Sequence, residues 1–353
     1  MDFSRIADLP LTVETVDYRQ QERDTSSGFM RKTTTFVLSG AGVEGQGEDV
    51  TYDTEDHDAL AEAWADADGS PYDLAGEYTF AEFSNRLDEV DLFPTKEPER
   101  ETAHHYRRWG LESAGLDLAL RQAGENLGSV LGREYSPVRF VASTRLGEPP
   151  STDRVDTILD RHPDTGFKLD PTAEWTPDIV DALAATGAVR ILDIKGQYKG
   201  TEVDTEPDAA LYELLFEEFP DAVVEDPAVV PETEAVVEAN RDRLSWDVPI
   251  TSVESVEKLP YPPSWLNIKP SRFGTVESLC ATIAYADEHD ITLYGGGQFE
   301  LDVGREQIQA IASLCYPDGP NDVAPGVYNE PDLPDDLPSS PLHPGEPVGL
   351  GLF

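Results

Sequence analysis

The sequence reads ILDIK at 191–195, AVVED at 222–226, PITSVES at 249–255 and WLNIK at 265–269, followed by ITLYGGG at 291–297. The first four runs end in the charged tips Asp193, Glu225, Glu254 and Lys269, which lie 32, 29 and 15 residues apart. Each spacing has room for a strand, a crossover and a return to the next parallel strand. The stretch therefore predicts a parallel α/β barrel.

The composition of these runs supports that prediction. Parallel strands are covered on both faces, so they occur as continuous apolar runs and not as alternating patterns. The carboxyl ends of barrel strands are where such folds carry their chemistry. Asp193, Glu225 and Glu254 would repel one another at this rim unless a cation or a proton shared the space. We therefore expect these three carboxylates to hold a divalent metal.

The chain divides into three parts. Residues 11–52 are expected to form an antiparallel meander with turns at glycines, and residues 56–133 are mostly helical by pattern. Seven candidate strands then alternate with helix-like segments from 138 to 296, which favours a closed barrel over an open sheet. This predicts an α+β capping domain (1–135), a barrel domain (136–320) and a C-terminal segment (321–353). That last segment either wraps back toward the cap or is a flexible tail.

The charge of the chain excludes some partners. Seventy acidic residues against 26 basic ones give a formal net charge of −44. Nucleic acids and anionic membrane surfaces are therefore poor partners. The acids are interleaved with apolar periodic runs, which favours a folded protein with an acidic surface over a disordered one. Such a surface is expected in the cytoplasm of a salt-loving organism, and assembly as a monomer or a homo-oligomer stays open.

Lysine is rare in this sequence. Seven lysines occur among 26 basic residues, yet Lys168, Lys195 and Lys269 all fall at or near the ends of predicted strands. Lysine can lose its proton when its pKa is lowered, whereas arginine in practice cannot. These three lysines are therefore either acid/base groups of a site or ion-pair partners of crowded carboxylates.

The remaining features indicate a cytoplasmic protein. Cys280 and Cys315 lie in helix-like apolar stretches, so a disulfide framework is not expected. The N-terminal residues have no basic start followed by an apolar block, so no signal peptide is predicted. No apolar run reaches the length of a membrane span.

Four motifs, taken together and in this order, resemble the enolase superfamily and its muconate-cycloisomerase-like, o-succinylbenzoate synthase-like subgroup. The resemblance covers nearly the whole chain, and its motifs are TTTFVLSGAGVEGQGE (33–48), RWGLESAGLDLAL (108–120), IKPSRFG (268–274) and YGGGQFELDVGR (294–305). The fold that it implies is a modified (β/α)7β TIM-like barrel with an N-terminal capping domain.

The resemblance also implies roles for individual residues. Asp193, Glu225 and a third acid after strand five, here Glu254, would bind Mg²⁺. Lys168 after strand two and Lys269 after strand six would be the general acid and base on opposite faces of the substrate. The implied reaction removes the α-proton of a carboxylate, as in a racemase or epimerase, a cycloisomerase or a lyase. A hard cation can stabilise the resulting ene-diolate, and a lysine beside it would have its ammonium form disfavoured.

The sequence departs from the subgroup's pattern at three positions. Val253 stands where a ligand is usual after strand five, Lys195 stands where asparagine is usual after strand three, and Asp170 takes the place of a second lysine on strand two. Whether Lys168 or Asp170 occupies the catalytic position stays open. The alternative is a barrel without metal chemistry, a binding protein or metal-free isomerase, in which Lys195 takes the place of the cation.

The glycine triplet is the remaining candidate for substrate binding. Around Gly296, backbone amides are accessible to a carboxylate or a phosphate, and a phosphate-binding barrel unrelated to this superfamily is a further alternative. Gln298, Glu300 and Asp302 alternate as on a strand, so at least one is expected to face the site. Together with Lys195, we expect Gly296, Gln298 and Glu300 to contact the substrate.

Overall fold

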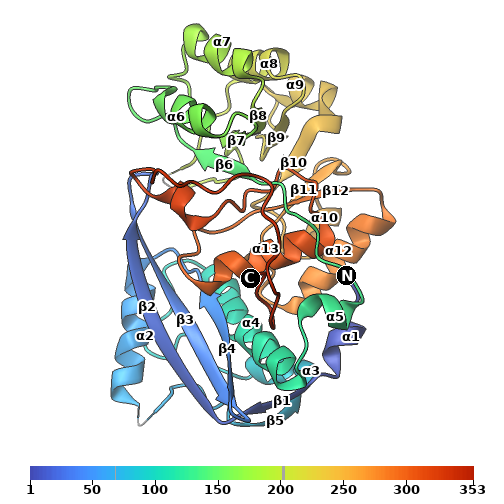
Figure 1. Cartoon of the computed structure of the whole chain (residues 1–353). Coiled ribbons are helices and arrows are strands. Elements are labelled where there is room, and N and C mark those ends of the chain that lie inside the picture. Colours follow the sequence, from blue (N-terminus) through green and yellow to red (C-terminus); the bar gives the residue numbers. More distant parts are fainter. Residues whose placement is uncertain (68, 201–202) are drawn as a thin grey trace.

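A computed structural model describes residues 1–67, 69–200 and 203–353. The N-terminal part contains a three-stranded antiparallel sheet in the order β2–β3–β4 and a separate antiparallel pair, β1 with β5 (Figure 1). These strands are β1 (Pro10–Val13), β2 (Thr15–Asp24), β3 (Met30–Gly40), β4 (Val43–Asp49) and β5 (Gly76–Thr79). The predicted antiparallel meander is therefore confirmed.

Helix α4 packs directly on β4 and is almost entirely buried. Gly45 of β4 permits this contact, because a Cβ at that position would lie 2.1 Å from the backbone nitrogen of Leu118. Gly45 and Gly47 are among the glycines that were expected to mark turns, but both lie within β4. The helices of this part are α1 (Ser4–Ala7), α2 (Thr54–Asp66), α3 (Phe80–Leu87), α4 (Ala103–Ala123) and α5 (Leu127–Leu131).

The second part is built on a seven-stranded parallel sheet in the order β12–β11–β10–β9–β8–β7–β6. Neighbours in this order are also neighbours in the chain, as right-handed βα crossovers produce. The strands are β6 (Val141–Thr144), β7 (Gly166–Leu169), β8 (Val189–Asp193), β9 (Val223–Glu225), β10 (Leu244–Trp246), β11 (Trp265–Ile268) and β12 (Thr292–Gly295). Six of these seven strands lie where the sequence predicts them.

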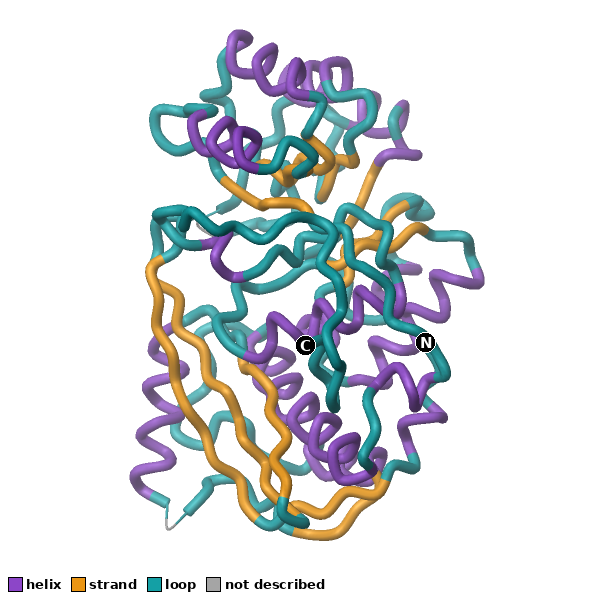
Figure 2. Tube along the Cα trace, in the orientation of Figure 1, coloured by secondary structure: helices purple, strands orange, loops and turns teal. Residues whose placement is uncertain are grey.

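Helices connect the strands and cover the outside of the sheet (Figure 2). They are α6 (Asp153–Arg161), α7 (Pro177–Thr186), α8 (Ala209–Glu218), α9 (Glu234–Ala239), α10 (Val253–Glu257), α11 (Pro270–Phe273), α12 (Val276–Glu288) and α13 (Val303–Cys315), with 3-10 turns η1 (Arg241–Arg243) and η2 (Gly326–Asn329). Among the described residues, no helix combines the length and the apolar character that crossing a bilayer requires.

The fifth strand differs from the prediction. A strand was expected at 249–253, but the fifth strand is β10, which ends directly before Asp247. Residues 249–252 lead instead into α10, where Ser252 is the N-cap and exchanges capping hydrogen bonds with Ser255. The β-branched residues of this segment therefore precede a helix and do not form a barrel strand.

Residues from the C-terminal segment close the barrel between its two edge strands. Asn321 pairs with Phe140 beside β6, and Asp322 pairs with Gly296 after β12. The Asn321 amide also accepts a hydrogen bond from the Gly295 nitrogen at 2.7 Å. Two residues thus occupy the place of an eighth strand.

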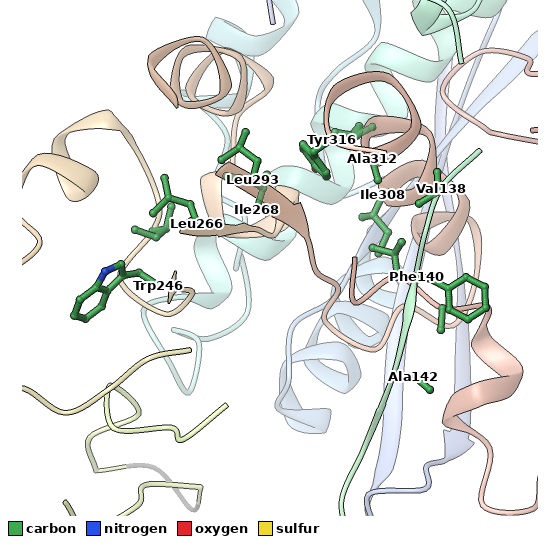
Figure 3. Packing of buried hydrophobic residues seen from close by; sticks show 14 of the residues in the cluster. Val138, Phe140, Ala142, Trp246, Leu266, Ile268, Leu293, Ile308, Ala312 and Tyr316 are labelled. Carbon is green, nitrogen blue, oxygen red and sulfur yellow. The ribbon is translucent and has the colours of Figure 1, made fainter. Parts of the chain in front are cut away.

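One continuous apolar core joins the outside of the sheet to its helices, and Figure 3 shows Leu266, Ile268 and Leu293 of β11 and β12 beside Ile308 and Ala312 of α13. The chain's last residues join this core, because Leu350 is fully buried and its nitrogen donates to Asp117 of α4 at 2.8 Å.

Candidate functional site

Three carboxylates lie side by side at the carboxyl ends of β8, β9 and β10. Asp193 and Glu225 are register partners at the ends of their strands, and Asp247 directly follows β10. Each is at most 1% exposed. Isolated buried carboxylates are very costly, so this cluster must be paired with cations or protons.

Lys168, on the neighbouring strand β7, connects two of these carboxylates. Its Nζ lies 2.5 Å from Glu225 Oε1, 3.4 Å from Asp193 Oδ2 and 3.6 Å from Asp322 Oδ2. Burial alone would lower the pKa of Lys168, but these three carboxylates outweigh burial and raise it well above its ordinary value. Lys168 is therefore an ammonium ion at neutral pH.

Asp247 is held by two cations from the segment after β11. Lys269 Nζ lies 2.8 Å from Asp247 Oδ2, and Arg272 Nε lies 2.9 Å from Asp247 Oδ1. Helix α11 turns immediately after Lys269, with Pro270 at its first position, and this brings Arg272 back onto the same carboxylate. Burial opposes protonation of Lys269, yet Asp247 raises the pKa of this lysine.

A disfavoured ammonium was expected for a lysine beside a bound metal ion, and the cluster of side chains alone gives the opposite direction. The reason is the number of carboxylates: those facing Lys168 and Lys269 stabilise the charged forms more than burial destabilises them. In the structure as it stands both lysines therefore hold their protons.

Lys195 enters the cluster from the loop after β8. Its Nζ lies 2.7 Å from Asp193 Oδ2 and 3.3 Å from Asp170 Oδ2. Its backbone is left-handed, with φ of 53°, and Asp226 after β9 and Phe299 after β12 are also left-handed, with φ of 52° and 56°. Left-handed non-glycine residues are strained and cluster at functional sites. Three strand ends of one barrel share this feature.

Glu254 does not belong to the cluster. It lies in the first turn of α10, with a side chain that is 75% exposed and paired with Lys258 at 2.5 Å. The residue at the corresponding strand end is Asp247, which the sequence-based prediction missed. The sequence marks this position only by an acid, Asp247, that directly follows the short run LSW (244–246).

The glycine-rich end of β12 approaches Lys269. A Cβ on Gly296 would lie 2.4 Å from Asn267 Oδ1 and 2.8 Å from Lys269 Cε, so any larger residue would displace these two side chains. Gln298 is 1% exposed and accepts a hydrogen bond from Tyr52 of the N-terminal part at 2.7 Å. Glu300 instead pairs with Arg305 at 3.1 Å.

The carboxylates of the cluster differ in pKa. Burial opposes ionisation of Asp193 and Asp247, but their lysine and arginine neighbours hold both pKa values below the ordinary range. Burial, together with the carboxylates of Asp193 and Asp247, raises the pKa of Glu225 to about 7 against the opposing effect of Lys168. Burial and the neighbouring Asp247 raise the pKa of Asp226 well above its ordinary value. Carboxylates that resist ionisation in this way are electrostatically suited to a further cation.

The donor set can be tested against a divalent metal. Asp193, Glu225 and Asp247 provide buried carboxylate oxygens, the ligands that Mg²⁺ prefers, in a site short of positive charge. As the side chains lie, ammonium groups bridge these carboxylates, and no acidic, histidine or cysteine triad within the described ranges converges closely enough to chelate an ion. The residues fit Mg²⁺ in chemistry and charge. Mg²⁺ binding requires the lysine ammonium groups to move away from these carboxylates.

Comparison with solved structures places this architecture among proteins of the enolase superfamily. The muconate lactonizing enzyme from Pseudomonas putida matches with a TM-score of 0.69 at 19% identity, covering 97% of each chain. Muconate cycloisomerase from Pseudomonas fluorescens matches with a TM-score of 0.69 at 18% identity, covering 98% of this chain and 96% of that one. A Listeria innocua member of the enolase superfamily matches with a TM-score of 0.65 at 15% identity, covering 90% and 86%.

At these identities the likeness shows the fold, a capping domain on a (β/α)7β barrel. No curated protein matches the sequence. Two family models do, one over residues 4–130 and the other over residues 134–330. They are the N-terminal and C-terminal domains of one family, and the C-terminal model alone covers more than half of the chain. The chain therefore belongs to the family described as domain of unknown function DUF8230.

Proposed function

We propose that this protein is an enzyme that removes the proton α to a carboxylate in a small-molecule substrate, as a racemase or epimerase, a cycloisomerase or a lyase of the enolase superfamily. One observation carries the proposal. Lys168 on β7 and Lys269 after β11 flank the three strands whose ends supply Asp193, Glu225 and Asp247. Two proton carriers thus stand on either side of an acidic cluster in a buried site.

Asp193, Glu225 and Asp247 are the residues that would hold Mg²⁺. A bound Mg²⁺ would stabilise the negative charge that develops on the substrate carboxylate as the α-proton leaves. Asp247 replaces Glu254 in this assignment because it is buried at the strand end, whereas Glu254 faces solvent.

The lysines carry the proton. Lys269 Nζ accepts the α-proton once it is unprotonated, and Lys168 Nζ returns a proton from the other side of the cluster. Arg272 is always positively charged and pairs with Asp247. This carboxylate therefore stays neutralised when Lys269 releases its proton. Gly296 leaves room beside Lys269, and Gln298 and Lys195 are proposed to orient the substrate.

A second candidate function rests on the ion pairs themselves. Lys168 bridges Glu225 and Asp193, and Lys195 also contacts Asp193. In this alternative the ammonium groups replace the cation permanently, and the protein is a metal-free isomerase or a binding protein. The motif IKPSRFG (268–274) supports the first candidate and, within it, the o-succinylbenzoate synthase-like and epimerase-like reactions.

Two measurements test the proposal. Proton NMR in D₂O would follow exchange of the α-proton in a panel of dipeptides, N-acylamino acids and cyclohexadiene carboxylates. We expect exchange that Lys269→Ala abolishes and that Lys258→Ala, a change at an exposed lysine, leaves intact. Exchange that persists in Lys269→Ala would contradict the assigned role.

Calorimetric titration with Mg²⁺ separates the two candidates. Binding by the wild type that is lost in Asp247→Asn and kept in Glu254→Gln would support the metal site and its corrected third ligand. Absence of binding in the correctly folded wild type, with α-proton exchange present, would favour the metal-free isomerase.

A further inference from the structure

We propose that Tyr294, Asn267 and Ser245 form a polar floor whose task is to hold the Glu225 carboxylate in one orientation, with Tyr294 as the principal positioning residue. The proposal rests on the proposed function, because it assigns these residues to the site that would bind the metal. They lie on three consecutive strands, β12, β11 and β10, and each is at most 1% exposed.

The contacts of the floor converge on one oxygen atom. Tyr294 donates its phenolic proton to Glu225 Oε2, and Asn267 Nδ2 donates to the same atom at 3.0 Å. The other oxygen, Oε1, receives Lys168 at 2.5 Å. Glu225 is thus held through Oε2 from within the barrel, while Oε1 is directed at the lysine and the other carboxylates.

Ser245 completes the arrangement. Its Oγ lies 2.9 Å from the Tyr294 hydroxyl. A phenol has one proton, and an ionised carboxylate is a stronger acceptor than a hydroxyl. With Glu225 ionised, Tyr294 donates to Glu225 Oε2, and the Ser245 hydroxyl is left to donate to the phenolic oxygen.

Packing alone does not explain these residues. The Tyr294 ring packs against Val141, Ile191 and Val223 inside the barrel, where branched apolar residues are usual and phenylalanine would fill the same space. Burying a hydroxyl costs free energy unless it is hydrogen-bonded.

Asn267 gives a second indication. Its Oδ1 is buried and has no hydrogen-bond partner among the described residues. An amide that leaves its own acceptor unsatisfied is not optimised for internal pairing. What it does satisfy is Glu225, through Nδ2. The floor therefore serves the carboxylate, and its removal would leave Glu225 held through Oε1 by Lys168 while Oε2 loses its partners.

Partners that orient a metal ligand are worth about 10- to 100-fold in metal affinity. We expect Tyr294→Phe to weaken Mg²⁺ binding by a factor in this range, measured by calorimetry. Tyr328→Phe is the matched control, because Tyr328 is also 1% exposed and donates one hydrogen bond, to Pro338 O at 2.6 Å, far from the cluster. Thermal unfolding would show that both variants are folded.

The outcomes separate the two proposals. Weaker binding in Tyr294→Phe with unchanged binding in Tyr328→Phe supports the floor, and equal affinity of Tyr294→Phe and wild type overturns it while leaving the proposed function intact. If the wild type binds no Mg²⁺, the metal part of the proposed function fails. A crystal structure of Tyr294→Phe then decides the floor alone: a rotated Glu225 carboxylate supports it, and an unmoved one overturns it.

Discussion

Replacing Asp247 with asparagine tests the electrostatic account of the cluster most directly. The substitution keeps the size and shape of the side chain but removes its charge. Lys269, at 2.8 Å, and Arg272, at 2.9 Å, would lose their shared counter-ion while remaining buried. Tyr198, whose hydroxyl lies 3.0 Å from Asp247 Oδ2, keeps an amide partner.

The expected loss of stability is large. Removing one partner of a buried ion pair costs about 3–5 kcal/mol, because the other charge stays in the interior without compensation. Two cations depend on Asp247, which places the loss in this range unless one of them deprotonates. Lys269 can do so and Arg272 cannot, so one uncompensated guanidinium remains and a loss of about 3 kcal/mol is expected.

Urea unfolding without added Mg²⁺, followed by circular dichroism, would measure this loss. Glu254→Gln provides the control, since it makes the same kind of change at an exposed ion pair and is expected to leave the midpoint unchanged. A loss below about 1 kcal/mol for Asp247→Asn would refute the reasoning. It would mean that solvent reaches the two cations and that the cluster is not a low-dielectric site.

Three further predictions concern pH and packing. Because Asp247 raises the pKa of Lys269, kcat/KM for α-proton exchange should increase as pH rises above neutrality, and Lys258→Ala, at an exposed ion pair, should leave this pH dependence unchanged. Burial raises the pKa of Glu48 to about 7, so the folded state binds its proton more tightly and stability falls as pH rises from about 4.5 to 7; the wild type minus Glu48→Gln difference in urea midpoint should show this slope. Gly45→Ala would place Cβ against the Leu118 backbone and should cost about 1–3 kcal/mol in the same unfolding assay, more than Gly42→Ala, where the Cβ meets open space and only backbone strain opposes it.

The sequence predicts the strands that carry most of the site because a buried parallel strand ending in charge is a recognisable pattern. Asp193 and Glu225 were located in this way, each at the end of a continuous apolar run, and Lys168 lies one residue before the end of β7. Asp247 was missed because Ser245 interrupts the apolar run of its short strand, whereas the equally short β9 lies in the unbroken run AVV (222–224). Glu254 was selected in its place because β-branched residues precede it, although they lead into a capped helix.

The pairing of the charged groups could not be predicted from the sequence. Lys168 is 57 residues from Glu225 in the chain, and only the register of β7, β8 and β9 brings them together. The same holds for Arg272, which returns to Asp247 because α11 turns at once after β11. Whether a lysine has a raised or a lowered pKa depends on these pairings, and in the cluster of side chains alone the carboxylates raise the pKa values of Lys168 and Lys269.

The use of lysine in this cluster carries a mechanistic argument of its own. The chain uses arginine for most of its positive charge, and Arg272 shows that a buried arginine can neutralise a strand-end carboxylate here. If Lys168, Lys195 and Lys269 served only as counter-ions, arginine would serve as well and with more hydrogen bonds. What arginine cannot do is release its proton or withdraw a compact ammonium group from a carboxylate that another cation is to occupy. Three lysines, two of them buried, against one arginine in the same acidic cluster therefore favour a site whose charges move during the reaction over one whose ion pairs only stabilise the barrel.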